Sequence, residues 1–195
     1  KQYNSNSFYN LGYLYYNGYG VDKSIIKAIE YLEESAKLGN TYGLNLYGYI
    51  YVAGFDVEFN FAKAKEYYKK ALNLGNLNSY LNLAFLYQEG YGTVKNELKA
   101  AFYIKEAVKK NADRAIYHYG RILKHGLGVE KDLNEARKNY ERAAKMGNTN
   151  AVHSLGNMYF HGIGVEKDYE KARWYYQLSA NDMNRSSLFK LGIIY

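Results

Sequence analysis

The chain of 195 residues contains no cysteine and no proline. Without cysteine, a disulfide framework, a thiolate metal site and a cysteine nucleophile are all excluded. Without proline, no helix is interrupted by a residue that lacks a backbone N–H, and there is no proline-rich tract of the kind found in disordered segments. These two absences favour helices joined by short loops, and they leave the cellular compartment open.

Long apolar runs and low-complexity stretches are also missing. No run approaches the ~18–20 apolar residues that a membrane-spanning helix needs, and the segment Lys1-Gln2-Tyr3-Asn4 has no signal-like apolar core. The chain starts without methionine and stops within a helical pattern, Leu191-Gly192-Ile193-Ile194-Tyr195. We therefore expect further protein sequence beyond both ends.

The net charge of +7 is not gathered into one stripe. Residues 113–148 are the most basic part, with eight Lys and Arg against five Asp and Glu, and the excess falls away gradually on both sides. A backbone-tracking nucleic-acid site usually shows a denser basic surface. An RNA-binding helical-repeat protein that uses this basic part is therefore kept as an alternative function, and nucleic acid is not the expected partner.

What the sequence does contain is one strict period. Five glycines recur at intervals of thirty-six residues without insertion or deletion: Gly18, Gly54, Gly90, Gly126 and Gly162. A fixed period of this length is the mark of a solenoid, in which one supersecondary unit is stacked on copies of itself.

Small residues keep fixed places within the period. When the sequence is written in rows of thirty-six residues, one column holds Gly12, Gly48, Ala84, Gly120 and Gly156, and another holds Ala28, Ala64, Ala100, Ala136 and Ala172. Large residues such as Leu11 and Tyr47 fill the column beside the first one. Such columns predict two helices per unit whose backbones approach closely at the small residues.

The boundaries of the second helix are marked by side-chain type. Its predicted N-caps, whose side chains can accept a hydrogen bond from a free amide, are Ser24, Asn60, Asn96, Asp132 and Asp168. Its predicted ends are left-handed C-caps at Gly39, Gly75 and Gly147, with Asn111 and Met183 in place of glycine in two units. Each helix is expected to be roughly thirteen residues, or about 20 Å, long.

These patterns predict an all-α fold. We expect a right-handed α-α superhelix of about five 36-residue helix-loop-helix repeats plus the first helix of a sixth. The whole of residues 1–195 is predicted to be one solenoid domain. The predicted units are 5–40, 41–76, 77–112, 113–148, 149–184 and a partial 185–195.

The repeated residues resemble a known family. Leu11-Gly12, Tyr15, Gly18-Tyr19-Gly20-Val21, Ala28, Ala36 and Gly39 are similar to the Sel-1-like repeat, a relative of the tetratricopeptide repeat. The fifth unit matches best, and the resemblance covers the whole chain. Two departures, Asp56 for a loop glycine and Thr93 for valine, concern only local loop geometry.

The resemblance implies a scaffold or adaptor that is not an enzyme and needs no cofactor. Members of the family look like holders of signalling, host-interaction or toxin-immunity complexes, and an adaptor in protein quality control is kept as an alternative. The expected partner is another protein or an extended peptide, with an acidic segment where it meets arginine.

By analogy with tetratricopeptide repeats, the first helix of each unit lines the concave face. Aromatic rings and amides there suit a peptide or partner helix, and the fourth unit adds basic residues. The predicted partner-binding residues are Tyr9, Tyr13, Tyr16, Tyr49, Phe85, Arg114, Tyr117, Arg121, Lys124, His125, Asn157 and Phe160.

Two other kinds of chemistry are set aside. His118, His125, His153 and His161 cluster in sequence, but helices one unit apart lie roughly 8–10 Å from each other, and no cysteine completes a metal-ligand set. The Gly-x-Gly loops follow no predicted strand and precede no Gly-Lys-Ser/Thr motif, which favours turns over phosphate binding. We expect no catalytic, cofactor or metal site.

Overall fold

A computed structural model describes residues 4–54 and 56–180 of the chain. Within these residues there are ten helices and no strand, as the all-α prediction requires. In chain order the helices are α1 (Ser5–Asn17), α2 (Ile25–Lys37), α3 (Thr41–Ala53), α4 (Phe61–Asn73), α5 (Asn78–Glu89), α6 (Glu97–Lys109), α7 (Asp113–His125), α8 (Leu133–Lys145), α9 (Thr149–His161) and α10 (Tyr169–Ala180). The predicted partial sixth unit, residues 185–195, and the predicted cap at Met183 lie outside the described residues.

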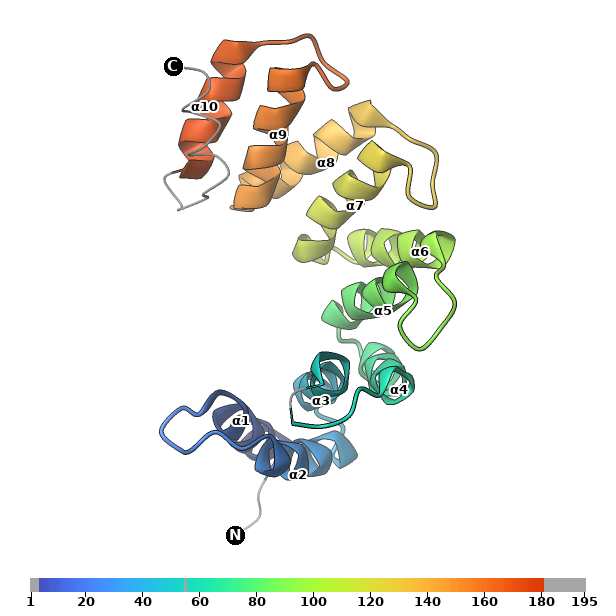
Figure 1. The fold of residues 1–195 in the computed structure, drawn as a ribbon, viewed down its shortest axis with the longest axis vertical. Coiled ribbons are helices and arrows are strands. Elements are labelled where there is room, and N and C mark those ends of the chain that lie inside the picture. Colours follow the sequence, from blue (N-terminus) through green and yellow to red (C-terminus); the bar gives the residue numbers. More distant parts are fainter. Residues whose placement is uncertain (1–3, 55, 181–195) are drawn as a thin grey trace. The chain divides into compact units, whose positions relative to one another are not determined.

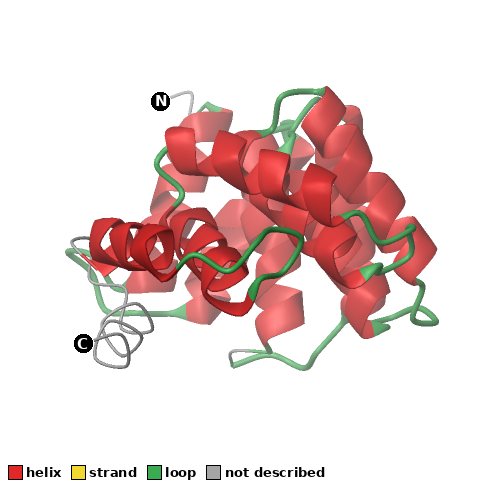
Figure 2. Ribbon diagram, turned by 90° about the horizontal axis from the view of Figure 1, so that it is seen from above, coloured by secondary structure: helices red, strands yellow, loops and turns green. Residues whose placement is uncertain are grey.

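Within each unit, first and second helices pack in successive pairs that each form one repeat: α1 with α2, α3 with α4, α7 with α8 and α9 with α10 (Figure 1). Their connections are loops, as Figure 2 shows in green. The chain divides into two compact units, residues 1–103 and residues 104–195. The first unit holds α1 to α5 and the start of α6, and the second holds the end of α6 and α7 to α10. That all 195 residues form a single domain stays a prediction.

The predicted N-caps of the second helices are confirmed. The side chain of Asn60 accepts a hydrogen bond from the Lys63 amide at 2.9 Å, and that of Asp132 accepts from the Glu135 amide at 2.8 Å. The same bond forms at Ser24, Asn96 and Asp168. Each bond satisfies one of the backbone amides that have no partner inside the helix.

The left-handed turns are also present, and they persist where glycine is replaced. Gly39, Gly75 and Gly147 have φ of 75°, 87° and 83°, and Asn111 takes φ 57° at the equivalent place. Asp56, which replaces a loop glycine, has φ 51°. Asn and Asp tolerate this region better than other side chains, so the departures from the repeat pattern leave the backbone conformation intact.

The close approach of paired helices occurs at the small columns, as predicted. A Cβ built on Gly120 of α7 would lie 2.8 Å from Cε1 of Tyr140 and 3.2 Å from the carbonyl oxygen of Ala136 on α8. Gly48 meets Tyr68 in the same way, and Gly156 meets Tyr176. The tyrosine ring therefore takes the space that a side chain on the facing helix would need.

Replacing Ala136 with tryptophan is expected to destabilise the protein by ~1–3 kcal/mol through overpacking, because Ala136 is fully buried against α7. The control is Ala62→Trp, because Ala62 is exposed. The free energy of unfolding of this variant is expected to stay within about 0.5 kcal/mol of the parent. Thermal unfolding of the two variants measures the difference. Equal midpoints for A136W and the parent would contradict the packing described for this column.

A lysine and two tyrosines stack on each other in three of the repeats. In the first repeat the Tyr15 and Tyr31 rings are 5.5 Å apart, and Lys27 Nζ lies 5.2 Å from the Tyr15 centroid. The equivalent sets are Tyr87, Tyr103 and Lys99, and Tyr159, Tyr175 and Lys171. Cation–π contacts of this kind contribute about 0.5–1 kcal/mol at exposed sites.

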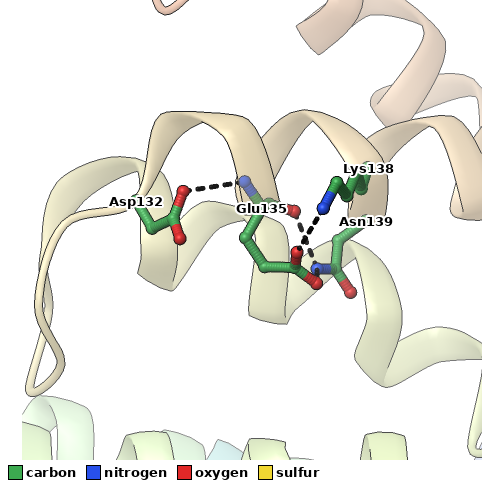
Figure 3. A network of polar contacts seen from close by, with 4 residues as sticks. All are labelled: Asp132, Glu135, Lys138 and Asn139. Atoms are coloured by element: carbon green, nitrogen blue, oxygen red, sulfur yellow. Dashed lines mark hydrogen bonds and ion pairs between the residues drawn. The ribbon is translucent and has the colours of Figure 1, made fainter.

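The fourth repeat replaces all three members of this stack together, with Leu123, Glu135 and Asn139. Figure 3 shows the polar network that stands there instead. The Asn139 amide donates to the Glu135 carbonyl at 2.8 Å, and Lys138 Nζ lies 3.3 Å from the Glu135 carboxylate. The fourth repeat thus differs from its neighbours on the second helix as well as on the basic first helix.

Candidate functional site

Five tyrosines form a surface on α1 and α3, which we call the tyrosine surface: Tyr9, Tyr13, Tyr16, Tyr42 and Tyr49. The Tyr9 ring lies 6.0 Å from Tyr13 and 5.9 Å from Tyr42, and Tyr16 meets Tyr49 edge-on at 6.4 Å. Tyr13, Tyr42 and Tyr49 are exposed, whereas Tyr9 and Tyr16 are half-buried and pack against the core of the first repeats. The structure therefore brings together four predicted residues and adds Tyr42.

The helices beneath the tyrosine surface carry no formal charge. Neither α1 nor α3 contains Asp, Glu, Lys or Arg. Burial, followed by the neighbouring tyrosines, raises the pKa of Tyr9 and Tyr16 above the ordinary value of 10.0. The hydroxyls stay protonated at neutral pH, so this surface offers apolar ring faces and neutral hydrogen-bonding groups.

Two asparagines on these helices, Asn6 and Asn45, join neighbouring repeats. Asn6 accepts a hydrogen bond from the Asn40 amide at 2.7 Å, and Asn45 accepts from Asn82 at 2.8 Å and from Ser79 at 3.2 Å. Asn6 and Asn45 occupy the same repeat positions as the predicted binding residues Arg114 and Tyr9. In the structure their amide oxygens serve the packing of one repeat on the next.

Phe85 of α5 is exposed, but its ring contact runs to a loop and not to the tyrosine surface. The ring lies 5.6 Å from Tyr91, which stacks on Phe61 at 4.6 Å. Phe61 in turn stacks on the exposed Phe59 at 5.8 Å. Phe85 is thus one end of a second aromatic row in the first unit.

The basic residues that the sequence singled out lie together on α7 in the second unit. The group consists of Arg114, Arg121, Lys124 and His125 with Tyr117, and we call it the basic group. Arg114 and Arg121 are exposed, and Tyr117 packs 5.8 Å from the Tyr140 ring. All five predicted residues of the fourth unit are therefore carried by this one helix.

Positive charges in the basic group shift one another's protonation. Burial, and then Arg121, lowers the pKa of Lys124, and burial, followed by Lys124 and Arg121, lowers the pKa of His125 below 6.5. His118 is largely buried, and its pKa is lowered by burial and then by Arg121 and Arg114. Because both histidines are neutral at pH 7, the positive charge of the group comes from its arginines and Lys124.

Asn157 and Phe160 of α9 lie against α10. The Tyr176 hydroxyl donates to Asn157 Oδ1 at 2.9 Å, and burial raises the pKa of Tyr176 to about 12. The Phe160 ring lies 5.4 Å from Tyr169 and 6.3 Å from Tyr176. Asn157 and Phe160, which the sequence predicts to bind a partner, therefore also help to pack α9 against α10.

Apolar surfaces on second helices escaped the sequence analysis. Val94, Leu98 and Phe102 are exposed by 86%, 72% and 58% and follow one another at four-residue spacing from the loop before α6 into that helix. Trp174 and Leu178 are exposed by 57% and 45% on α10. The four-residue spacing was a readable signal, but the repeat pattern directs attention to the first helices.

The described residues contain neither a cluster of potential metal ligands nor a helix that could span a membrane. No group of three or more His, Cys, Asp or Glu side chains in residues 4–54 and 56–180 is placed to hold a metal ion. Among the helices described, none is both long and apolar enough to cross a bilayer. The surfaces described above are aromatic, basic or apolar, and such surfaces are typical of binding proteins.

The repeated helix pairs define an α-solenoid, a class of proteins that present extended surfaces to partners. The Sel1 repeat family model matches the chain five times, at residues 9–40, 41–76, 77–111, 113–148 and 149–182. The chain belongs to the Sel1 repeat family. This result confirms the resemblance seen in the sequence.

Solved structures of similar proteins agree with this assignment. A Sel1 repeat protein from Oxalobacter formigenes is 26% identical, with a TM-score of 0.88 over 98% of this chain and 78% of its own. The protective antigen c5321 of uropathogenic Escherichia coli, which has an SLR fold, is also 26% identical, with a TM-score of 0.80 over 98% of this chain. The chain spans only 41% of that antigen's length.

The immunity protein Pa5087 of Pseudomonas aeruginosa is 21% identical, with a TM-score of 0.64 over 94% of this chain and 67% of its own. At this identity the likeness shows the fold alone. No curated protein matches the sequence.

Proposed function

We propose that the protein is a scaffold that binds a partner protein, or an extended segment of one, through the first helices of its repeats. Sel1 repeat solenoids generally act as interaction scaffolds and not as enzymes. The observation that carries the proposal is the contrast between first helices: α1 and α3 carry exposed rings and no charge, and α7 carries the basic group.

The tyrosine surface suits the apolar part of such a partner. Tyrosine gives a large contact area with few rotatable bonds, and its hydroxyl can donate to or accept from a peptide backbone. The half-buried Tyr9 and Tyr16 hold the exposed rings of Tyr13, Tyr42 and Tyr49 in edge or tilted contact. Less side-chain entropy is then lost on binding than with freely rotating groups.

The basic group suits an acidic segment of the partner. Arginine binds carboxylates through two parallel hydrogen bonds, and Arg114 and Arg121 are both exposed on α7. Lys124 is already partly desolvated next to Arg121, so an incoming carboxylate relieves the repulsion between the two cations. We therefore assign the acidic contact to the second unit.

The double variant R121E/Y117A tests this assignment. We expect at least a tenfold loss of affinity for a glutamate-rich synthetic peptide, because removing one partner of a desolvated charge pair typically costs about 2–5 kcal/mol. Isothermal titration calorimetry with the purified protein measures the affinity. Affinity purification with quantitative mass spectrometry, with parent and variant as baits, then identifies the proteins whose recovery depends on the same residues.

Lys110→Glu is the matched control, because it reverses one exposed charge near the end of α6 in the same unit without touching the basic group. Circular dichroism confirms that both variants remain folded. Parent-like peptide affinity of both R121E/Y117A and K110E would show that the basic group is not the binding surface. Loss of binding in both would show a general charge effect.

A further inference from the structure

A groove lies between the second helices α8 and α10 of the second unit. Its walls are Glu141, Ala144 and Lys145 of α8 and Trp174, Tyr175 and Leu178 of α10, and its floor is Val152 and Leu155 of α9. The two floor residues are almost fully buried. The cavity volume is about 250 Å³, below the roughly 300–1,000 Å³ of small-molecule sites. That size suits side chains of a partner better than a free ligand.

The first unit contains the equivalent groove, between α2 and α4, and its chemistry is different. There the cavity is about 140 Å³, and Glu33, Lys37 and Lys70 line it. Glu66 and Lys70 of α4 form an ion pair at 2.7 Å. Trp174 and Leu178 occupy these two positions in α10. The second repeat therefore has an exposed ion pair at the two positions where the fifth repeat has large apolar side chains.

The Trp174 ring packs on one neighbouring ring. It meets Tyr175 edge-on at 4.8 Å, and Tyr175 stacks on Tyr159 at 5.7 Å. Yet 57% of Trp174 and 45% of Leu178 are exposed. A large aromatic side chain left exposed beside a groove is the kind that anchors protein interfaces.

One end of the groove has an unbalanced positive charge. In the first and third repeats the lysine at the end of the second helix is paired with a glutamate, Lys37 with Glu34 at 2.7 Å and Lys109 with Glu106 at 2.6 Å. In α8 the glutamate's place is taken by Arg142, and Lys145 has no ion pair with the residues described around it. Glu141 on the same wall is neutralised by Arg137.

From these observations we infer that the groove between α8 and α10 docks an amphipathic helix of another protein. The helix carries two large apolar side chains one turn apart, which pack on Trp174, Leu178 and the floor, and acidic residues beside them, which face Lys145. A second copy of this chain is a poorer occupant, because its net charge of +7 and the basic edge of the groove repel each other.

Trp174 provides the readout, since it is the single tryptophan of the chain. The probe is a synthetic alanine-based helical peptide with two leucines four residues apart and glutamates on either side of them. Because binding removes the indole from water, we expect a saturable shift of its emission to shorter wavelength. Two control peptides replace the leucines with alanine or the glutamates with lysine, and each is expected to bind at least about tenfold more weakly.

Two protein variants introduce the residue types that the second repeat carries at these positions. Leu178→Lys keeps the fluorescent reporter and is expected to weaken the leucine peptide at least about tenfold. Trp174→Glu, followed by calorimetry, is expected to abolish binding. Both side chains are exposed, so the thermal midpoints are expected to remain within about 2–4 °C of the parent. Lys110→Glu, remote in sequence from the groove, is expected to bind the peptide as the parent does.

Three outcomes would overturn the proposal. Absence of an emission shift with the leucine and glutamate peptide would show that the groove does not take such a helix. Equal binding of the lysine peptide would show that the basic edge does not select the partner. A tryptophan emission shift that increases with protein concentration in the absence of peptide, together with dimers in sedimentation velocity, would show that a second copy of the chain is the occupant.

Discussion

Replacing Tyr140 with alanine is expected to lower the free energy of unfolding by about 3–5 kcal/mol, as is typical for removing a buried aromatic ring. Only 1% of Tyr140 is exposed, and it packs with Ile116, Leu155 and Met158 in the main core cluster of the second unit. Burial also raises the pKa of Tyr140, since the ionised form loses its hydration there. Urea denaturation followed by circular dichroism measures the change.

The facing glycine allows a sharper test of the same contact. Gly120→Ala in the parent is expected to destabilise, because the new Cβ would lie 2.8 Å from the Tyr140 ring. In the Y140A background the ring is gone, and the same change is expected to cost less, because only the Ala136 carbonyl oxygen, 3.2 Å away, still crowds the new Cβ, and the higher helix propensity of alanine opposes that cost. The effect of one substitution thus depends on the other, which a double-mutant cycle detects.

The control for the ring is Tyr169→Ala, because more than half of Tyr169 is exposed in the same unit. Its expected cost is below about 1 kcal/mol. If Y140A and Y169A unfolded at the same urea concentration, the buried tyrosine would not be a main contributor to the core. If G120A had the same effect in both backgrounds, the ring and the glycine would not be in contact.

Local chemistry made the helix boundaries predictable. An N-cap such as Asp132 bonds to an amide three residues away, so side-chain type and position in the period were enough to find it. The close approach at Gly120 was predictable for a related reason, because a column of small residues marks places where the neighbouring helix leaves no room for a side chain. These features repeat with the period, and the period is visible in the sequence.

The functional surfaces depend on contacts that the period does not encode. Asn45 occupies the same repeat position as the predicted binding residue Tyr9, but its amide oxygen accepts hydrogen bonds from Ser79 and Asn82, which are 34 and 37 residues away. Trp174 was not among the residues predicted to bind a partner. Its exposure depends on how α10 lies against α8, and the groove becomes evident only beside the Glu66–Lys70 pair of α4. The groove was therefore found by comparing equivalent surfaces of the folded repeats, and not by comparing the repeats in the sequence.

Replacing Gly92 with alanine is expected to cost about 3 kcal/mol or more, the second large effect on stability. Gly92 has φ 62°, a conformation that costs other residues roughly 1–2 kcal/mol. A Cβ there would also lie 2.6 Å from Cβ of Phe61, 2.9 Å from its carbonyl carbon and 3.1 Å from the Ala62 nitrogen. Because two of these atoms are backbone, the second repeat cannot yield as a flexible side chain could, and overpacking adds ~1–3 kcal/mol.

Gly20 separates these two contributions, since it occupies the same column with φ 70° but has no atom within 4 Å of a built Cβ. Gly20→Ala is therefore expected to cost only the ~1–2 kcal/mol of the backbone conformation. Chemical denaturation of G20A and G92A gives the difference, which measures how tightly the loop of the third repeat packs on the start of α4. Equal losses would mean that the loop glycines serve only the turn. A larger loss for G92A would show that the loop of the third repeat also packs on the second repeat. Gly20, at the same position of the first repeat, makes no such contact.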